Sequence, residues 1–529
     1  MSTPSLDEKS EYDGAQAVLT IQDLRIYHEK AAGRLVIDPA KARVEFGEHV
    51  ARRLKISLDG TKVLWPQPFD DPRDPQNWSD AQKNVQLALV TLAAVSPDFN
   101  VGIGIAGLRD IAQTFGVSTE KITSFTTSWA VFLLGWGGIF AVVLMQRYGR
   151  LPVLFWSQLA ALGFLIGCAV APNLATFAAM RFLTSFFCTV PQVTGLYVVS
   201  DIFPFHLQAH KLNIWVMGFI ISPFFPPFAL GYLVPRAGWR WAYGVGIIYN
   251  GIVVLLIALF GRETLFDRRD PDAYEHVPAD TLGSRVRTLV GVTGARLARF
   301  RAGWRELVLC PLQLIWRPHL LSIMVYEGLL FGFSIGMNLT NSLFLGEPRP
   351  LGYGYSQDAI ATIYITPIVS VVLGQVLGHF LNDFIVTRAI RRNGGVYEAE
   401  SRLWTCVVAL PIYVVGLVVS GAAFQEKLSV AAVVMGWGIR EVAVMINTVA
   451  VYAYANDCFP RYPGEISGLL NLFRTLGGFA MPYFQTTWAR KNGALQVFGC
   501  EAAIVAGMFF MIVPAVYYLG RQLRAKYSM

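Results

Sequence analysis

Charged residues are scarce in this sequence. The chain of 529 residues is only 15% charged and is 54% hydrophobic, and its mean hydropathy is +0.45. A soluble chain normally carries about 25% charged residues, and a water-soluble fold could not hide this much apolar surface. The composition therefore excludes an ordinary soluble protein and indicates that lipid is part of the solvent of this chain.

The motifs of common enzymes and of nucleotide-driven pumps are also missing. The sequence has no P-loop and no H-E-x-x-H, and its closest histidines are His206 and His210. The six cysteines form no C-x-x-C pair, so we expect small buried hydrophobic residues rather than a disulfide or metal site. No nucleophile–base pair or metal set converges within the apolar runs. We therefore expect no enzymatic activity and no cofactor.

Twelve apolar runs are long enough to cross a bilayer, which takes about 20 helical residues. The first six lie near 85–107, 122–144, 152–171, 174–198, 212–233 and 240–260. The other six lie near 320–344, 358–381, 402–421, 429–454, 466–488 and 495–519. We predict an all-α polytopic membrane protein with twelve transmembrane helices in two pseudo-symmetric six-helix bundles. Such a layout is typical of transporters whose substrate site lies between the halves.

Polar segments divide the chain into five predicted parts. These are a partly disordered tail (1–84), a first bundle (85–261), a central loop (262–319), a second bundle (320–519) and a short tail (520–529). Because the tail is polar, the first apolar run is expected to act as the signal anchor. Basic residues gather in the central loop, in the loops after the second and eighth runs, and in the last residues. By the positive-inside rule, these loops and both termini are cytoplasmic, and the net charge of +8 reflects topology rather than nucleic-acid binding.

Five ionisable residues stand out inside the apolar runs, where each costs about 2.5–3.5 kcal/mol at a helix centre. They are Asp98, Arg181, Glu327, Arg440 and Glu441. They belong to the first, fourth, seventh and tenth helices, the innermost four of the six-plus-six architecture, so we predict that they line a substrate and proton pathway. Two alternatives stay open. Arg181 and Glu327 could reach the membrane interface from helix ends, and Arg440 and Glu441 should point about 100° apart, so one could brace a neighbouring helix.

Glu441 is expected to share its helix face with Trp437, Met445 and Thr448, which follow helical spacing. An acid beside an aromatic ring and a thioether suits an organic cation, and ordinary helix packing is the alternative. Carboxyl groups in such a place can also carry protons, because burial and a nearby cation have opposite effects on their protonation. We therefore add Trp437 to the predicted pathway.

The fifth apolar run is interrupted by small residues and prolines. These are Ser222, Pro223, Pro226, Pro227 and Gly231. Proline removes backbone hydrogen bonds and bends a helix. We predict a gating motif here, with plain packing of a bent helix as the alternative.

The loop after the second run reads G-I-F-A-V-V-L-M-Q-R-Y-G-R over residues 138–150. It resembles the loop motif of the major facilitator superfamily, which ends D-R-x-G-R. Arg147, Gly149 and Arg150 match the motif, and Gln146 stands in place of its acid. The resemblance implies a cytoplasmic gate and the major facilitator fold. The equivalent loop of the second half supplies further expected gate residues, which are Asn382, Asp383, Arg391 and Arg392.

Two helix patterns extend this resemblance. Arg181 matches the arginine that begins the fourth-helix motif of the superfamily, which is implicated there in proton coupling, and Ser185 replaces a glycine of that motif. The pattern around Pro223 is similar to the Gly-Pro motif of proton-coupled antiporters, with Ser222 and Pro226 where glycines are usual.

Longer strings resemble a fungal subgroup. They cover residues 71–78, 201–206, 391–403 and 454–485. Together they are similar to the fungal twelve-span drug:proton antiporter group, in particular to the branch with polyamine and cation permeases. The resemblance implies a secondary transporter working by alternating access.

The leading hypothesis is proton-coupled efflux of a drug-like compound or secondary metabolite. Proton-driven uptake of a polyamine-like cation is the alternative within this class, and a non-transporting sensor on a transporter scaffold is the alternative from another class. We expect the partners to be a small-molecule substrate, protons and the lipid bilayer, with a monomer as the functional unit. The expected location is the plasma membrane, with the vacuolar membrane as the alternative.

Overall fold

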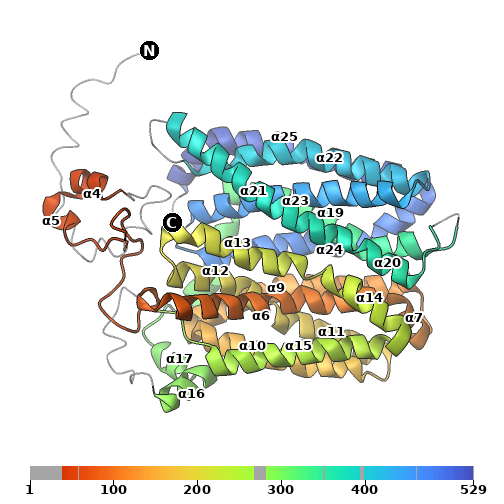
Figure 1. The fold of residues 1–529 in the computed structure, drawn as a ribbon, viewed down its shortest axis with the longest axis horizontal. Coiled ribbons are helices and arrows are strands. Elements are labelled where there is room, and N and C mark those ends of the chain that lie inside the picture. The colour runs from red at the N-terminus through yellow and green to blue at the C-terminus, as the bar shows by residue number, and fades with distance from the viewer. Residues whose placement is uncertain are drawn as a thin grey trace.

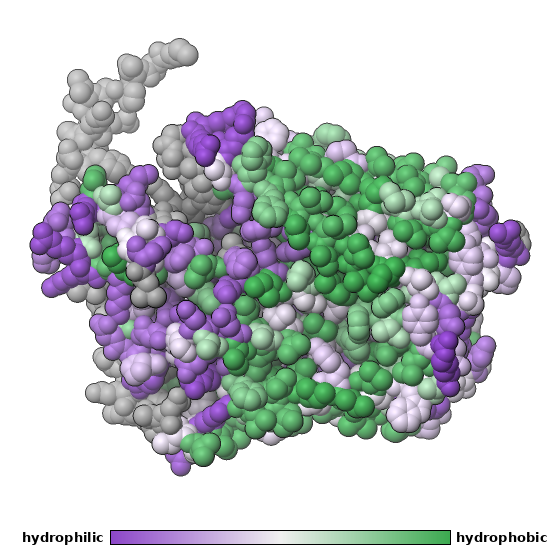
Figure 2. Space-filling model, viewed as in Figure 1, coloured by the Kyte–Doolittle hydropathy of each residue, from purple (hydrophilic) through white to green (hydrophobic). Residues whose placement is uncertain are grey.

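The computed structural model describes residues 38–57, 59–266, 281–349, 352–392, 398–459 and 461–527. Within these ranges, long helices run side by side along the longest axis of the molecule (Figure 1). Figure 2 shows a hydrophobic belt across the middle of the visible face and hydrophilic residues at both ends. Eleven of the described helices are long and apolar enough to cross a membrane. This pattern is the one expected of a membrane-spanning bundle.

The amino-terminal half contains six membrane-spanning elements. They are α6 (Asp80–Ala106), α9 (Trp129–Tyr148), α10 (Arg150–Ala169), α11 and α12 (Leu174–Cys188, Val190–Ile202), α13 and α14 (Phe205–Ile221, Phe225–Ala237) and α15 (Trp239–Phe260). Short elements α7 (Leu108–Phe115), α8 (Thr119–Ile122) and η2 (Thr123–Ser128) lead from α6 into α9. A capping box of Ser79 and Gln82 fixes the start of α6.

The carboxyl-terminal half repeats this layout. Its elements are α19 (Pro318–Gly346), α20 and α21 (Gln357–Ile363, Ile365–Arg392), η4 and α22 (Ala399–Leu403, Trp404–Gln425), α23 (Val430–Cys458), α24 (Pro463–Asn492) and α25 (Ala494–Lys526). All twelve predicted runs coincide with these elements, so the predicted fold class is confirmed. Helix α24 is 30 residues long but less apolar than the others, because it carries Glu465 and Arg474 in its buried part.

Two further segments lie at one end of the bundle (Figure 1). Residues 38–79 include α4 (Pro39–Phe46), α5 (Glu48–Ala51) and η1 (Pro75–Asn77), and residues 281–317 include α16 (Leu282–Val290), α17 (Val292–Leu297) and α18 (Trp304–Ile315). Around the side chain of Trp65, a small core of Ala42, Leu54 and Val63 orders part of the predicted tail. The rest of that prediction, residues 1–37, lies outside the described residues. We call this end of the bundle the central-loop end and the opposite one the α7 end.

The segment just before α6 forms a compact turn. Asp74 caps η1 by accepting a hydrogen bond from the Gln76 backbone N–H at 3.0 Å, and the Phe69 N–H donates to the same carboxylate. An ion pair with Arg73 holds the pKa of Asp71 below its usual value. These local bonds explain why the D-P-R-D-P-Q-N-W string leads directly into α6.

Helices α19 and α24 approach each other through glycines. A Cβ atom added at Gly477 would lie 2.2 Å from the Gly328 carbonyl oxygen and 3.0 Å from the Gly332 Cα. Since both neighbours are backbone atoms, neither can move without shifting a helix. Small residues allow such close helix contacts in membranes.

The variant Gly477→Ala is therefore expected to lose about 1–3 kcal/mol of stability, as overpacked sites do. The matched control is Gly507→Ala on α25, where an added Cβ would meet nothing within 4 Å. Thermal unfolding of the detergent-purified variants measures the difference. Equal melting temperatures for the two would contradict the close approach.

Candidate functional site

A chain of polar contacts links the two halves at mid-height. Asp98 of α6 accepts a hydrogen bond from Gln192 Nε2 of α12 at 2.6 Å. The Gln192 side-chain oxygen accepts one from Asn471 of α24 at 3.5 Å, and its backbone carbonyl accepts one from Ser467 at 3.3 Å. Asp98 is thus connected through one glutamine to the helix that lines the opposite half.

Arg474 of α24 lies beside this chain. Its guanidinium carbon is 3.2 Å from the centroid of the Phe331 ring, and Nη1 donates to the Tyr452 hydroxyl at 3.2 Å. The side chain is buried, and within the described residues its Nε has no hydrogen-bond partner. Such a buried charge needs electrostatic compensation, because hydrocarbon does not solvate it.

The compensation comes from an acid of each half. The charge of Arg474 interacts with Asp98 of α6 and with Glu327 of α19. Glu327 is itself fixed by Asn447 and Thr448 of α23, which donate to its two oxygens at 2.7 and 2.8 Å. We call Asp98, Glu327 and Arg474 the central charge group.

A second polar group lies within the carboxyl-terminal half. Arg440 Nη2 is 3.1 Å from the Glu441 carboxylate, and the Ser334 hydroxyl donates to that carboxylate at 2.9 Å. The two neighbours were expected to point about 100° apart, yet their side chains form an ion pair. Both side chains are fully buried among α19, α22 and α23.

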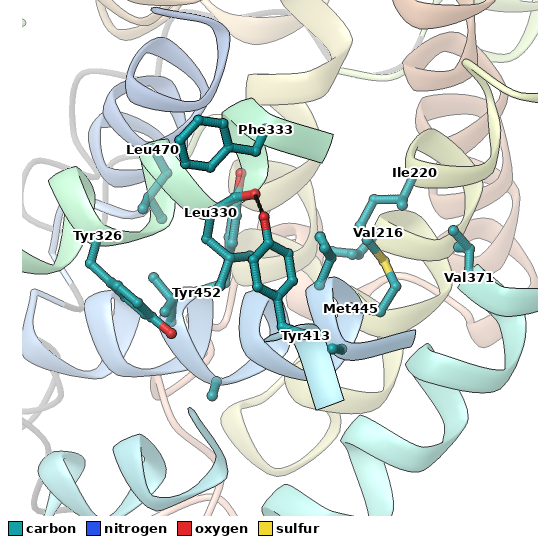
Figure 3. Close-up of a cluster of buried hydrophobic side chains, with 14 of the residues drawn as sticks. Val216, Ile220, Tyr326, Leu330, Phe333, Val371, Tyr413, Met445, Tyr452 and Leu470 are labelled. Atoms are coloured by element: carbon teal, nitrogen blue, oxygen red, sulfur yellow. Dashed lines mark hydrogen bonds between the residues drawn. The ribbon is translucent and has the colours of Figure 1, made fainter. Parts of the chain in front are cut away.

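The residues expected on the face of Glu441 take different neighbours. Trp437 packs edge-on against Phe224 of the other half at 6.4 Å and against Tyr364 at 5.1 Å. Thr448 binds Glu327 instead of Glu441. Met445 belongs to the buried cluster in Figure 3, which also contains Val216 and Ile220 of α13. The interface between the halves is therefore apolar and aromatic around these charges.

Arg181 is placed inside the amino-terminal half. Its Nη2 donates to the Val101 carbonyl of α6 at 3.0 Å, and its Nη1 donates to the Tyr243 hydroxyl of α15 at 3.3 Å. Gly104 makes room for it, since an added Cβ there would lie 1.9 Å from Nη1. The structure thus puts Arg181 near α6, but its contacts run to α15 rather than across the interface.

At the central-loop end, the halves meet through a triad of side chains. Gln146 at the end of α9 donates to the Tyr197 hydroxyl of α12 at 3.0 Å and also to Glu465 of α24. Tyr197 in turn donates to Glu465 at 2.9 Å. We call these three residues the gate triad. Its acid comes from the second half, which compensates for the missing acid at position 146.

Each half also contains an ion pair between two of its own helices. Arg150 at the start of α10 pairs with Asp201 at the end of α12 and lies over the Tyr197 ring at 4.2 Å. In the second half, Arg402 before α22 pairs with Asp457 at the end of α23. The two pairs occupy equivalent helix ends, so the pseudo-symmetry of the halves extends to their charges.

Gly149 is required by its backbone conformation, with φ at +101°. The Glu263 carboxylate accepts from the backbone N–H groups of Arg150 and Leu151 at the start of α10. Such an acid at a helix amino terminus is stabilising. Arg147 extends to the central segment, where Nη1 donates to the Ala302 carbonyl at 2.8 Å.

The gate residues expected in the second half are more dispersed. Asn382 is buried and accepts a hydrogen bond from Thr405. Asp383 lies 3.6 Å from His379 of the same helix. Arg391 and Arg392 are exposed at the end of α21.

The fifth run is broken where its prolines predict. Helix α13 ends at Ile221 and α14 begins at Phe225, and the Ser222 hydroxyl donates to the Phe219 carbonyl. Pro223 and Pro226 lie against Gly102 of α6. Pro227 is buried, and Gly231 lies against Ala361 of α20 in the other half. The motif thus lies at the interface, and its gating role stays a prediction.

The α7 end is also closed by contacts between the halves. Arg236 pairs with Asp358 at 3.2 Å, and Arg490 pairs with both Glu120 and Glu347. Beneath these contacts is a small pocket of about 190 Å³, lined by residues that include Arg109, Thr119 and Gln357. A drug-sized ligand usually needs about 300 Å³ or more, so this pocket is too small for one.

The sequence reasoning missed four buried charges in the carboxyl-terminal half. They are Glu400, Glu465, Arg474 and Glu501. Glu501 of α25 accepts a hydrogen bond from Gln485 at 2.8 Å. Each lies within or beside a predicted apolar run, so a complete search for ionisable residues in those runs would have found them.

Comparison with solved structures supports the fold described above. The chain is similar to a structure of the xylose transporter XylE from E. coli in a partially occluded inward-open conformation, with a TM-score of 0.60 and 13% identity over 82% of this chain and 98% of that one. A peptide-bound transporter of the POT family gives a TM-score of 0.56 at 11% identity, over 83% and 96%.

Sequence relatives are fungal. "MFS transporter fsa7" of Fusarium sp. (strain FN080326) is 28% identical over 69% of each chain. "Efflux pump radE" of Floropilus chiversii is 23% identical over 88% of this chain and 85% of its own. "MFS-type transporter hepF" of Aspergillus oryzae is 24% identical over 88% and 95%. The family model of the Major Facilitator Superfamily matches residues 88–482. The chain therefore belongs to the Major Facilitator Superfamily and is a multi-pass membrane transporter.

Proposed function

We propose that this transporter exports small organic molecules in exchange for protons, by alternating access to a site between its halves. The central charge group carries the proposal. Arg474 is buried, it belongs to one half, and its charge acts on an acid from each half. Asp98 and Glu327 therefore compete for one positive charge.

Protonation changes the outcome of this competition. A proton on Asp98 removes its attraction for Arg474 and leaves the arginine to Glu327 within the same half. Loss of that proton restores an attraction across the interface. The free energy that holds the halves together at mid-height thus depends on proton binding, which is the coupling that alternating access requires.

Aromatic rings at the interface between the halves favour an apolar organic molecule as the substrate. Phe331, Tyr452 and Phe219 surround the Arg474 guanidinium, and Trp437 meets Phe224 across the interface. Sites for drug-like ligands are lined mainly by such side chains, with few polar groups. The names of the relatives, among them an efflux pump and a "Trichosetin biosynthesis cluster MFS transporter" of Gibberella fujikuroi, support export of a secondary metabolite.

The proposed orientation in the membrane follows from charge. Residues 281–317 contain seven arginines and one glutamate, and such segments stay on the cytoplasmic side. We therefore infer that the central-loop end faces the cytoplasm. The plasma membrane stays the expected location, because an exporter of small molecules would act there.

Flux measurements in yeast cells that express the full chain test the proposal. Cells loaded with the fluorescent organic cation rhodamine 6G are expected to export it faster when the medium is acidified, because inward proton flow drives an exporter. Addition of a protonophore should abolish the effect. Dye entry that rises with external acid would instead show uptake with protons, and flux that ignores the pH gradient would refute coupling.

A further inference from the structure

Helix α18 carries an exposed apolar stripe. Trp304, Val308 and Leu312 recur at every fourth position and so share one side of the helix, and Trp316 follows directly as its C-cap. Their exposed fractions are 44%, 49%, 50% and 79%. Two tryptophans on one stripe are typical of a helix at the surface of a bilayer, where the ring is half in lipid and half in water.

Helix α16 repeats this pattern. Leu282, Val286 and Val290 share a face by the same spacing and are 83%, 57% and 46% exposed. The end of α16 is fixed to the hydrophobic belt, because Trp156 of the membrane-spanning α10 donates its indole N–H to the Val290 carbonyl at 3.1 Å. This contact places the stripe of α16 next to surface that faces lipid.

The opposite face of α18 covers the gate triad. Leu307, Cys310 and Leu314 are buried on it, and α18 packs against α9 and α24. The Cys310 thiol lies 3.9 Å from the Glu465 carboxylate. In the preceding residues, Arg301 Nη1 donates to the Arg147 carbonyl at 2.9 Å. One helix thus contacts the gate on one side and presents apolar residues on the other.

The positive charge of residues 281–317 indicates which lipid headgroups they would bind. Among its seven arginines, Arg287, Arg296, Arg299 and Arg305 are exposed, and Glu306 is the single acid of residues 281–317. Basic residues beside an apolar helix face bind anionic headgroups, with a gain of about fivefold in affinity for each residue. A zwitterionic surface offers the stripe its apolar contacts but leaves these charges without counter-charges.

We propose that residues 281–317 form a binding surface for anionic phospholipids. The stripes of α16 and α18 lie in the headgroup layer, and the exposed arginines bind the lipid phosphates and carboxylates. Lipid binding therefore holds α18 against the gate triad. The surface is separate from the central charge group and does not depend on what the transporter carries.

A fluorescent probe on α18 tests this proposal in the full chain. An environment-sensitive dye is attached at Leu312→Cys in a Cys500→Ser background, because the other five cysteines are buried. The protein is placed in nanodiscs of phosphatidylcholine alone or with phosphatidylserine, some of them with brominated acyl chains. With phosphatidylserine present, we expect blue-shifted emission and quenching by bromine. A dye at Gln313→Cys, beside the stripe, should respond less.

Triple variants separate charge from folding. Arg296→Gln, Arg299→Gln and Arg305→Gln together should weaken the preference for phosphatidylserine about a hundredfold, from about fivefold for each arginine. The matched control replaces Arg43, Arg52 and Arg53, which are exposed on α4 and just after α5, away from the bundle (Figure 1). Dye emission that is identical in both lipid mixtures would overturn the proposal. An unchanged preference for phosphatidylserine in the variant that lacks Arg296, Arg299 and Arg305 would also overturn it. So would bromine quenching that changes only when an acidic protein is added, because the partner would then be a protein and not a lipid.

Discussion

Replacing Arg474 by glutamine is expected to reduce pH-driven transport about 10- to 100-fold, the usual size of a coupling between two sites. In the variant, neither Asp98 nor Glu327 has the buried positive charge that acts on both in the structure. The competition between the two acids for one positive charge is then lost, and with it the proposed link between proton binding and the contact of the halves. Flux in response to an imposed pH gradient measures the loss.

The variant Arg474→Lys is expected to retain part of the coupling. It keeps the charge but loses the planar group that stacks on Phe331 at 3.2 Å. The control Arg521→Gln removes an arginine with an 80% exposed side chain from α25 and should leave flux unchanged. Full pH-driven transport by a well-expressed Arg474→Gln protein would exclude Arg474 from the coupling.

Breaking the gate hydrogen bond between Gln146 and Glu465 should give the second large effect. In Gln146→Glu, a carboxylate replaces the amide that donates to Glu465, and two acids then face each other across the interface. Such a like-charge contact costs several kcal/mol. We expect the central-loop end to open, transport to fall, and the buried Cys310 thiol beside Glu465 to react with a maleimide at least about tenfold faster, since about 1.4 kcal/mol corresponds to a factor of ten.

The double variant Gln146→Glu with Glu465→Gln restores one donor and one acceptor in reversed order. It should return both transport and Cys310 reactivity toward their original values. This rescue distinguishes a specific hydrogen bond from general damage to the protein. If the single variant labels Cys310 no faster than the original chain, the triad does not control access at this end.

The membrane-spanning helices could be predicted because the bilayer sets both their length and their composition. The break between α13 and α14 was also visible, since prolines stand at Pro223, Pro226 and Pro227. The break between α11 and α12 near Thr189 was not predicted. A local change of direction inside an otherwise apolar run leaves little trace in composition.

The partners of the buried charges could not be predicted in the same way. Helical spacing places Thr448 near Glu441, but which helix approaches that face is decided by tertiary packing, and α19 brings Glu327 there instead. The Arg440–Glu441 pair depends on the arginine side-chain conformation rather than on the 100° between neighbours. Arg474 itself could be found from the sequence, as a charged residue in the eleventh apolar run. Its contact with Phe331 could not, because tertiary packing decides which ring lies beside it.

The ion pairs Arg150–Asp201 and Arg402–Asp457 each join two helices of a single half. If the two bundles separate at this end, neither ion pair has to break. Each bundle can then rotate as a rigid body in which its own helix ends remain ion-paired. Among the described residues, the bonds that the rotation must exchange for water here include those that reach Glu465 from the first half and those that join Asn213 of α13 to His379 and Gln375 of α21. Such a transporter can open its site to one side and then to the other repeatedly, without breaking the ion pairs within either bundle.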